Sequence, residues 1–289
     1  MSTNIEWTEE TWNPLAGCSK VSAGCKNCYA IRMANRLAHN PNKRIAEKYE
    51  GLTTKQANGE LNWTGKINFD QNTLMKKFPK TPTIYFVNSM SDLFHPKVPF
   101  YFIDQVYEIM GWHTEHIFQI LTKHPERALE YYKWTHIFNA WGEWDHLWVG
   151  TSVENQEYAN KRIPLLLSIP AKVRWLSCEP LLGNIDLTKF ILHEPYPQEK
   201  IDWVVVGGES GPKARIMQQD WARSLRDQCV SNNIPFFFKQ WGNYIHRDQI
   251  GEGKSAGKYY NAEYVKGGKN KLGNKIDGKK WKQYPKRIK

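Results

Sequence analysis

Three cysteines lie in one short stretch of this sequence, between Gly17 and Ala30. Cys18, Cys25 and Cys28 have the spacing C-x6-C-x2-C, and the residues after Cys28 are typical of the first turns of a helix. Three thiolates on one loop can hold a metal centre that a single thiolate could not. An odd number of protein ligands also predicts that one coordination position is left for another molecule.

The spacing leaves two kinds of metal centre open. Structural zinc is four-coordinate and usually joins two pairs of ligands that are each closely spaced in the sequence. This loop offers one such pair, Cys25 and Cys28, and an earlier cysteine. A fourth zinc ligand could come from His39, Cys178 or Cys229, none of which belongs to such a pair. In a [4Fe–4S] cluster each iron takes one thiolate, so three cysteines leave one iron open. An open iron can bind an amino-acid chelate, such as S-adenosylmethionine supplies in radical chemistry.

The length and composition predict a folded intracellular protein. The 289 residues suffice for one large α/β domain or two small ones, and 13 Trp, 14 Tyr and 12 Phe are too many for a disordered chain. The N-terminal residues lack a signal peptide, and no apolar run is long enough to span a bilayer. We therefore expect a cytoplasmic protein with reduced thiols and no membrane partner.

Positive charge is concentrated near the C-terminus. The formal net charge is +11, and residues 251–289 contain 12 lysines and arginines against three acidic residues. This segment is also rich in glycine and has several tyrosines and one tryptophan. Its charge suits a polyanion such as nucleic acid. The alternative is a solvated tail, or a strap folded back on the rest of the chain.

Apolar runs rich in β-forming residues alternate with helical patterns. A short extended piece at Thr11–Pro14 precedes the cysteine loop. Six further runs are Thr83–Val87, His116–Leu121, His146–Gly150, Lys172–Leu176, Asp202–Val206 and Ile234–Phe238. Helices are predicted at Tyr29–His39, Asp70–Phe78, Phe100–Met110, Pro125–Tyr132, Asn155–Leu167 and Asp220–Asn232. The alternation predicts an α/β fold, a partial or complete TIM-like (β/α) barrel of about six to eight parallel strands. Residues 1–250 would form the barrel, and residues 251–289 a basic C-terminal extension.

Polar residues follow these apolar runs at their C-terminal ends. In parallel α/β barrels these ends converge on one face, where active sites form. The cysteine loop follows the first strand, so we expect it on the same face. The candidate site residues at the strand ends are Asn88, Ser89, Asp92, Lys123, Glu154, Glu179, Glu209, Ser210 and Lys239.

Long stretches resemble the radical S-adenosylmethionine superfamily, and more closely a phage- and bacteria-encoded family of three-cysteine proteins grouped with it. The resemblance covers nearly the whole chain, including the cysteine loop. Its other elements are Ile5–Thr8, Thr11–Pro14, Phe86–His95, Gln119–Lys123, Leu176–Leu182, Trp203–Gly211, Phe237–Gly242 and Ile276–Trp281. The resemblance implies that Cys18, Cys25 and Cys28 are cluster ligands, but it does not give the reaction.

The sequence departs from the superfamily pattern at two points. The usual loop is C-x3-C-x2-C, whereas the first spacer here has six residues. The superfamily also carries Gly-Gly-Glu at the end of its second strand, where it receives the amino group of the cofactor. Here Gly207–Glu209 lies on a late strand. The cofactor groove could instead use Asn88, Ser89 and Asp92.

We predict a radical S-adenosylmethionine enzyme in which a [4Fe–4S] cluster generates a 5′-deoxyadenosyl radical, with a nucleic-acid base as the leading substrate. A flavodoxin- or ferredoxin-like protein would supply electrons. The predicted catalytic residues are Lys123, Glu154 and Lys239, and the predicted cofactor-binding residues are Asn88, Ser89, Asp92, Glu179, Glu209 and Ser210.

Other interpretations of the same residues stay open. The three glutamates could be buried, hydrogen-bonded carboxylates that fix loops, and the two lysines could form ordinary ion pairs. For the whole protein, one alternative is a zinc-stabilised nucleic-acid-binding module without catalysis. Another is a metal-dependent barrel hydrolase that acts on nucleic acid, with structural cysteines.

Overall fold

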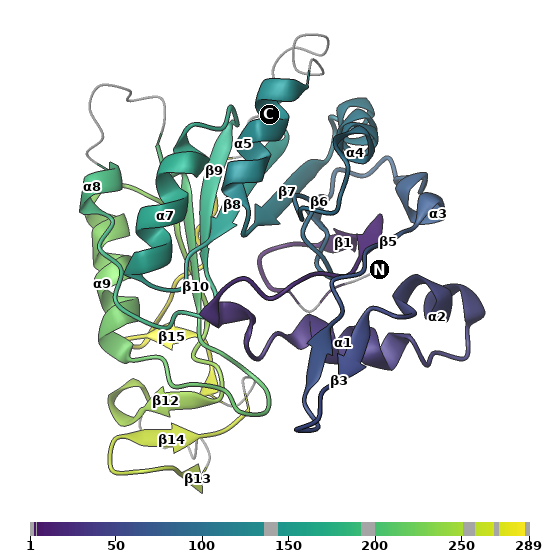
Figure 1. Cartoon of the computed structure of the whole chain (residues 1–289). Coiled ribbons are helices and arrows are strands. Elements are labelled where there is room, and N and C mark those ends of the chain that lie inside the picture. Colours follow the sequence, from purple (N-terminus) through teal and green to yellow (C-terminus); the bar gives the residue numbers. More distant parts are fainter. Residues whose placement is uncertain are drawn as a thin grey trace. The chain divides into compact units, whose positions relative to one another are not determined.

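The computed structural model describes residues 3, 5–135, 144–191, 200–250, 258–268 and 272–286. The chain divides into two compact units (Figure 1). One consists of Met1–Val149 and Ile169–Lys172, and the other of Gly150–Ser168 and Val173–Lys289.

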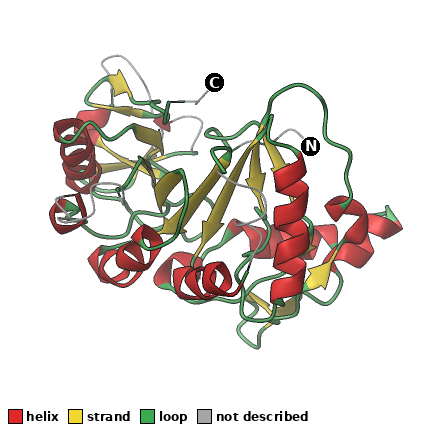
Figure 2. Ribbon diagram, turned by 90° about the horizontal axis from the view of Figure 1, so that it is seen from above, coloured by secondary structure: helices red, strands yellow, loops and turns green. Residues whose placement is uncertain are grey.

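Parallel strands form the centre of the first unit. Strand β6 pairs in parallel with both β1 and β7, and all four of its residues are buried, as expected of an apolar strand covered on both faces. The elements are β1 (Glu10–Trp12), β6 (Ile84–Val87), α4 (Phe100–Trp112), β7 (Ile117–Thr122) and α5 (Pro125–Trp134). Pro99 and Pro125 stand at the starts of the two helices, where a missing N–H costs nothing. Figure 2 shows helices (red) beside the strands (yellow).

Small elements surround the cysteine loop in the first unit. They are β2 (Leu15–Ala16), a 3₁₀ turn (Ala23–Cys25), α1 (Tyr29–Leu37), α2 (Lys43–Tyr49), β3 (Thr53–Lys55), β4 (Leu61–Trp63), β5 (Asn68–Phe69) and α3 (Gln71–Leu74). β2 pairs with β5, and β3 with β4, both antiparallel. The helix predicted at Asp70–Phe78 is wrong in its length. Asp70 caps its start by accepting from Thr73 N–H, but Pro79 disfavours helix at the preceding residue.

The second unit repeats the strand–helix alternation. Its elements are the end of β8 (Leu147–Ser152), α7 (Gln156–Leu167), β9 (Val173–Cys178), α8 (Thr188–Ile191), β10 (Trp203–Gly207), α9 (Gln219–Ser231) and β11 (Phe236–Gln240). β10 pairs in parallel with β9 and β11. All five residues of β10 are buried. Asn155 caps α7 by accepting from the N–H of Tyr158.

The described C-terminal segments pack within the second unit. β12 (Tyr244–His246), β14 (Tyr264–Lys266) and β13 (Lys258–Tyr259) form an antiparallel sheet, and β15 (Lys275–Ile276) pairs with β16 (Lys279–Lys280). A 3₁₀ turn, η2 (Arg247–Gln249), follows β12. Residues 281–283 lie along β11: Phe238 N–H donates to the Trp281 carbonyl, and Gln283 N–H to the Phe236 carbonyl. The described part of the basic extension is therefore folded onto the unit.

The fold class is the predicted one. Seven strands form one sheet in the order β1-β6-β7-β8-β9-β10-β11, and helices connect them. This is an α/β fold of the partial TIM-like type. The predicted domain boundary after residue 250 stays a prediction, and residues 251–257 lie outside the described residues. None of the helices described is both long and apolar enough for a membrane span.

Candidate functional site

Gly17 fixes the start of the cysteine loop. Its φ is +106°, and a Cβ atom there would lie 2.2 Å from the Lys66 carbonyl oxygen, so only glycine fits. Its N–H donates a hydrogen bond to the Met90 carbonyl (3.3 Å), and the residue also forms a parallel bridge with Ser91. The loop is thereby held against residues 88–92, the segment that follows β6.

The long first spacer of the loop is ordered by its own contacts. Nδ1 of the buried His95 accepts a hydrogen bond from Lys97 N–H (3.2 Å), so the neutral ring carries its proton on Nε2. That nitrogen lies 2.9 Å from Ser19 Oγ and donates to it. Near the end of the spacer, the 3₁₀ turn places Ser22 Oγ 3.6 Å from Cys25 Sγ.

The three cysteines are free thiols, and two of them pack against an apolar cluster. Cys25 is buried, whereas Cys18 and Cys28 are partly buried. Cys28 is the N-cap residue of α1. Cys18 and Cys28 pack against a cluster formed by Ala16, Ala30, Ile31, Ala34, Tyr49, Leu52, Trp63 and Met90. The small elements around the loop therefore serve to support it.

Burial makes the thiolate form of Cys18 and Cys28 unfavourable. It raises the pKa of Cys18, and the nearby charges of Asp92 and the other two sulfurs raise it further. Burial also raises the pKa of Cys28, although the backbone N–H of Ala30 and the charge of Lys123 act in the opposite direction. A bound cation would relieve this cost, because metal ligation replaces the thiol protons.

The separation of the sulfurs bears on the type of metal centre. Tetrahedral zinc with Zn–S bonds of about 2.3 Å would hold its sulfurs roughly 3.8 Å apart. In the described part of the chain, the group of ligand atoms lying within 4.8 Å of one another comes from other residues, not from the three cysteines. In a [4Fe–4S] cluster each thiolate binds a different iron, so the cysteine sulfurs lie farther apart than they would around one zinc ion.

Asn88 stands out beside the loop, at the end of β6. It is a non-glycine residue with a left-handed backbone (φ +63°), and it is 2% exposed. Neither its side-chain oxygen nor its side-chain nitrogen has a hydrogen-bond partner among the described residues. A buried amide without partners costs free energy. The arrangement fits a ligand that offers both a donor and an acceptor.

The other predicted residues of this unit are hydrogen-bonded. Ser89 Oγ lies 3.0 Å from Asn13 Oδ1, and the Ser89 carbonyl accepts from the Tyr29 hydroxyl (2.8 Å). Asp92 Oδ1 accepts from Thr122 Oγ1 (2.7 Å), and Oδ2 from the N–H of Lys123 (2.8 Å). Asp92 thus ties the end of β6 to the end of β7. The first unit brings the three cysteines, Asn88, Ser89, Asp92 and Lys123 into one neighbourhood.

Two predicted carboxylates of the second unit form well-covered ion pairs. Glu154, fully buried, lies 3.0 Å from the Arg162 guanidinium, which also donates to the Ser152 carbonyl. This pair anchors α7 to the end of β8. Glu179 and Lys239 lie 2.8 Å apart and are 15% and 20% exposed. Two residues predicted from separate strand ends are therefore brought into contact.

Glu209 is bound by Arg215 through both carboxylate oxygens. The guanidinium donates to them at 2.6 and 2.9 Å, and the backbone N–H of Arg215 adds a bond of 2.9 Å. Ser210, the next residue, is half-buried. In all three pairs the carboxylate holds a cation of its own chain, which is the structural role that the sequence left open.

The Gly-Gly-Glu segment is shaped by a close backbone crossing. A Cβ atom on Gly208 would lie 2.0 Å from the Trp241 carbonyl oxygen, and one on Gly207 would lie 2.9 Å from Glu179 Oε1. Gly208 N–H donates to the Gln240 carbonyl, and Asn243 N–H to the Glu209 carbonyl. Gly208 is explained by this contact with the residues after β11, and Gly207 by the Glu179 side chain packed against it.

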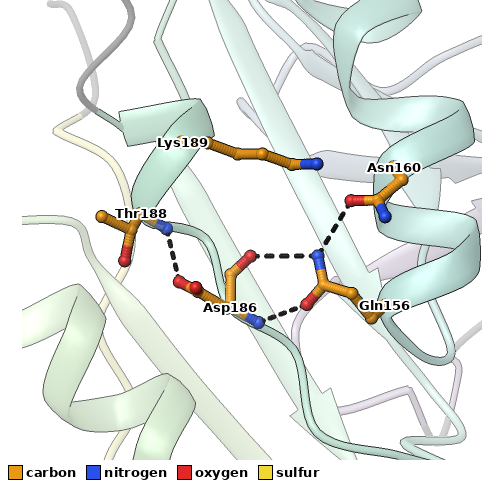
Figure 3. Close-up of a pocket in the computed structure, with 5 residues that line it drawn as sticks. All are labelled: Gln156, Asn160, Asp186, Thr188 and Lys189. Carbon is orange, nitrogen blue, oxygen red and sulfur yellow. Dashed lines mark hydrogen bonds between the residues drawn. The ribbon is translucent and has the colours of Figure 1, made fainter.

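A polar hollow of about 530 Å³ lies elsewhere in the second unit, at the start of α7. Its lining groups satisfy one another: Gln156 bonds to Asn160 and to the backbone of Asp186, while Asp186 accepts from Thr188 N–H (Figure 3). Lys189 extends across it. None of the residues predicted for the site lines this hollow.

Sequence reasoning missed His113, Glu115 and His116, whose ligand atoms cluster within 4.8 Å. The spacing of the two histidines, three residues apart in the sequence, is the signal that could have indicated this cluster. However, Nδ1 of His116 accepts from Thr83 N–H (3.2 Å), which places the ring proton on Nε2, the nitrogen that faces Glu115 at 3.5 Å. Metal ligation there would require that proton to move and the bond to Thr83 to break.

Comparisons with known proteins give one family. Neither the search of curated proteins nor the search of solved structures found a match. The family model described as "Protein of unknown function (DUF5131)" matches residues 2–285, and the chain therefore belongs to that family.

Proposed function

We propose that the cysteine loop holds a [4Fe–4S] cluster and that the protein is a radical S-adenosylmethionine enzyme. The observation that carries the proposal is the pairing of three free, largely covered thiols with the unpartnered amide of Asn88. Asn88 begins the segment after β6, and the cysteine loop is held against that segment by the contacts of Gly17 with Met90 and Ser91. The loop supplies three thiolates and lacks the second closely spaced ligand pair usual in structural zinc sites, which favours this centre over a single zinc ion.

The residues of the first unit would have distinct tasks. When bound, a reduced cluster would supply the one electron needed to cleave S-adenosylmethionine to methionine and a 5′-deoxyadenosyl radical. Cys18, Cys25 and Cys28 would each hold one iron. The oxygen of Asn88 would accept from the amino group of the cofactor, and its nitrogen would donate to the carboxylate.

Asp92 and Lys123 would position the groups around the cluster. Asp92 accepts hydrogen bonds from two residues at the end of β7, one of them the backbone N–H of Lys123, and so positions the backbone of Lys123. The charge of Lys123 stabilises the thiolate of Cys28. We propose that Lys123 also acts in proton transfer at the substrate. An external flavodoxin- or ferredoxin-like protein would supply electrons.

The second unit contributes less to the proposal. Catalytic roles for Glu154 and Lys239, and cofactor contacts for Glu179, Glu209 and Ser210, stay predictions. The ion pairs of the three glutamates are sufficient to explain their places in the fold. A catalytic role would require a substrate that exchanges with the partner cation.

The iron and sulfide content of anaerobically purified protein tests the proposal. We expect about four irons and four sulfides per chain, with the broad visible absorbance of a cluster. Cys25→Ala should abolish cluster binding, whereas Cys229→Ala, which removes a buried thiol of α9, should leave it intact. One zinc without iron, or unchanged iron in Cys25→Ala, would contradict the proposal.

A further inference from the structure

Two pairs of lysines lie directly opposite each other on neighbouring antiparallel strands of the second unit. In the β13–β14 ladder Lys258 is the partner of Lys266, and in the β15–β16 hairpin Lys275 is the partner of Lys280. All four are exposed. Like charges directly opposite each other in a sheet destabilise it. Two such pairs within 23 residues need a reason other than stability.

The carboxylates that the structure describes do not relieve this repulsion. Within the described residues, none of the four lysines forms an ion pair. Asp277, at the turn of the β15–β16 hairpin, is bound instead by Arg223 and Arg226 at 2.7 and 2.5 Å. The lysine pairs are therefore available to an external anion.

Two exposed tyrosines continue this surface. Tyr259 is 78% exposed and Tyr260 is 54% exposed, and they follow Lys258 directly. The guanidinium of Arg247 lies 4.6 Å from the centre of the Tyr259 ring, and Tyr244 packs edge-on against Tyr260 at 4.8 Å. Both rings are thus held in place while large parts of them face solvent.

Two hydrogen bonds and a cation–π contact connect the two hairpins through η2. Gln249, at the end of that turn, donates to Asp277 Oδ1 and accepts from its backbone N–H, both at 2.8 Å. Arg247, at the start of the same turn, covers Tyr259. The two hairpins are therefore parts of one supported surface, which we call the lysine–tyrosine surface: Lys258, Tyr259, Tyr260, Lys266, Lys275 and Lys280.

We infer that the lysine–tyrosine surface binds single-stranded nucleic acid. Lysine pairs spaced across a ladder neutralise successive phosphates, and exposed aromatic rings offer their faces to unstacked bases. A duplex would occupy the lysines but would leave the ring faces without bases to stack on. The inference does not depend on the proposed cluster, because every residue that carries it lies in the second unit.

Another role would account for part of the pattern. Lysines on edge strands prevent edge-to-edge association of sheets, and Lys258 lies on the outer strand of its sheet. That role explains neither lysine opposite lysine in both hairpins nor the adjacent exposed tyrosines. It also predicts a different outcome for the substitutions below.

The test is binding of the full chain to a labelled single-stranded oligonucleotide of about 20 nucleotides, longer than the ~4–16 nucleotides that such sites span. The variant is Lys258→Gln/Lys266→Gln/Lys275→Gln/Lys280→Gln. Its control is Lys55→Gln/Lys77→Gln, two exposed lysines of the first unit; Lys55 lies opposite Leu61. We expect the fourfold variant to lose affinity by at least about ten-fold. The slope of log binding constant against log salt concentration should also become shallower by about 3, since each phosphate contact contributes ~0.7 to that slope. The control should bind as the unaltered chain does.

Thermal unfolding of the same variants separates binding from folding. Removing like-charge pairs should leave the melting temperature unchanged or raise it. Tyr259→Ala/Tyr260→Ala should weaken single-strand binding by at least roughly ten-fold, with little effect on binding of a duplex of equal length. Unchanged binding in the lysine variant, with or without new self-association, would overturn the inference. Equal affinity for duplex and single strand, or tyrosine variants that bind normally, would overturn its single-strand part.

A chain with all three loop cysteines replaced by alanine distinguishes this inference from the proposed function. It should lose iron and keep oligonucleotide binding. Loss of oligonucleotide binding in that chain, while it remains folded, would contradict the inference. Failure of iron binding in the unaltered chain would bear on the cluster alone.

Discussion

The strand ends of the two units carry polar residues of similar kinds, but these residues differ in their partners. In the second unit Glu154, Glu179 and Glu209 each hold a cation of the same chain. In the first unit the buried polar atoms of Asn88 have no partner in the part of the chain that the structure describes, and the pKa of Cys18 is raised by burial. A protein that has already satisfied a buried group has less to gain there from a ligand.

This comparison separates position from function. Both sets follow parallel strands, where α/β folds place their sites. The distinguishing feature is whether the cost of burying a polar group is offset by a partner. Around the cysteine loop this cost is not offset within the described residues, whereas around the glutamates it largely is. The first unit is therefore the stronger candidate for binding a cofactor, and the second for supporting the fold.

The largest effect is expected from breaking the Glu154–Arg162 pair. Arg162→Ala would leave a fully buried carboxylate without its cation, so the free energy of unfolding should fall by about 3–5 kcal/mol. Urea denaturation measures this. Lys161→Ala, which removes an exposed partner of Glu157, should cost less than about 1 kcal/mol. Comparable losses in both variants would remove the structural role assigned to Glu154.

A smaller loss is expected at the Gly-Gly-Glu segment. Gly208→Ala would drive a Cβ atom into the Trp241 carbonyl, and the resulting strain should cost about 1–3 kcal/mol of unfolding free energy. Gly268→Ala is the control, because no atom lies within 4 Å of a Cβ there. If Gly208→Ala is as stable as the control but impairs cofactor binding, the segment belongs to the site rather than to the fold.

Asn88 should show the opposite behaviour. Asn88→Gly keeps the left-handed backbone and removes an unsatisfied amide, so stability should change by less than about 1 kcal/mol. Binding of S-adenosylmethionine by the reconstituted protein, measured by calorimetry, should weaken by at least about ten-fold. Asn233→Gly, at an exposed left-handed position, should change neither property. A large stability loss with normal binding would make Asn88 a structural residue.

The smallest effect concerns pH. The Arg223 guanidinium, with Arg226 and Gln249, lowers the pKa of Asp277 below its usual range. A carboxyl whose folded pKa is depressed stabilises the fold above its unfolded pKa of about 3.9 and loses that contribution as the pH falls toward the folded value. Asp277→Asn should therefore lower the melting temperature near neutral pH, and the difference from the unaltered chain should shrink in acid. A constant difference would contradict the assignment.

The sequence was sufficient for the fold class and for the strands. Apolar runs such as Thr83–Val87 coincide with strands because a chain buried on both faces must be apolar along its length. The helix after Cys28 was also predicted, and it is present. The elements between residues 43 and 63 were missed, because short, partly exposed segments carry little periodicity.

The chemistry of the strand ends was harder to predict. A carboxylate after a strand is visible in the sequence, but whether a cation six or eight residues later turns back to it depends on the loop between them. The left-handed backbone of Asn88 and its missing partners are tertiary properties. The Gly-Gly-Glu string resembled a cofactor motif, but Gly208 is required by the crossing with Trp241, and Gly207 lies against the Glu179 side chain.

The contacts of residues 281–283 with β11 have a consequence for biosynthesis. β11 ends the order of strands in its sheet, and it contains three consecutive phenylalanines, Phe236–Phe238. While the chain emerges from the ribosome, this strand is made before the residues that pair with it at 281–283. Its edge would stay open during that interval, and open apolar edges recruit other chains. Ribosomal stalling shortly before Trp281 should therefore produce nascent chains that need a chaperone, although nearly all of the sheet has been synthesised.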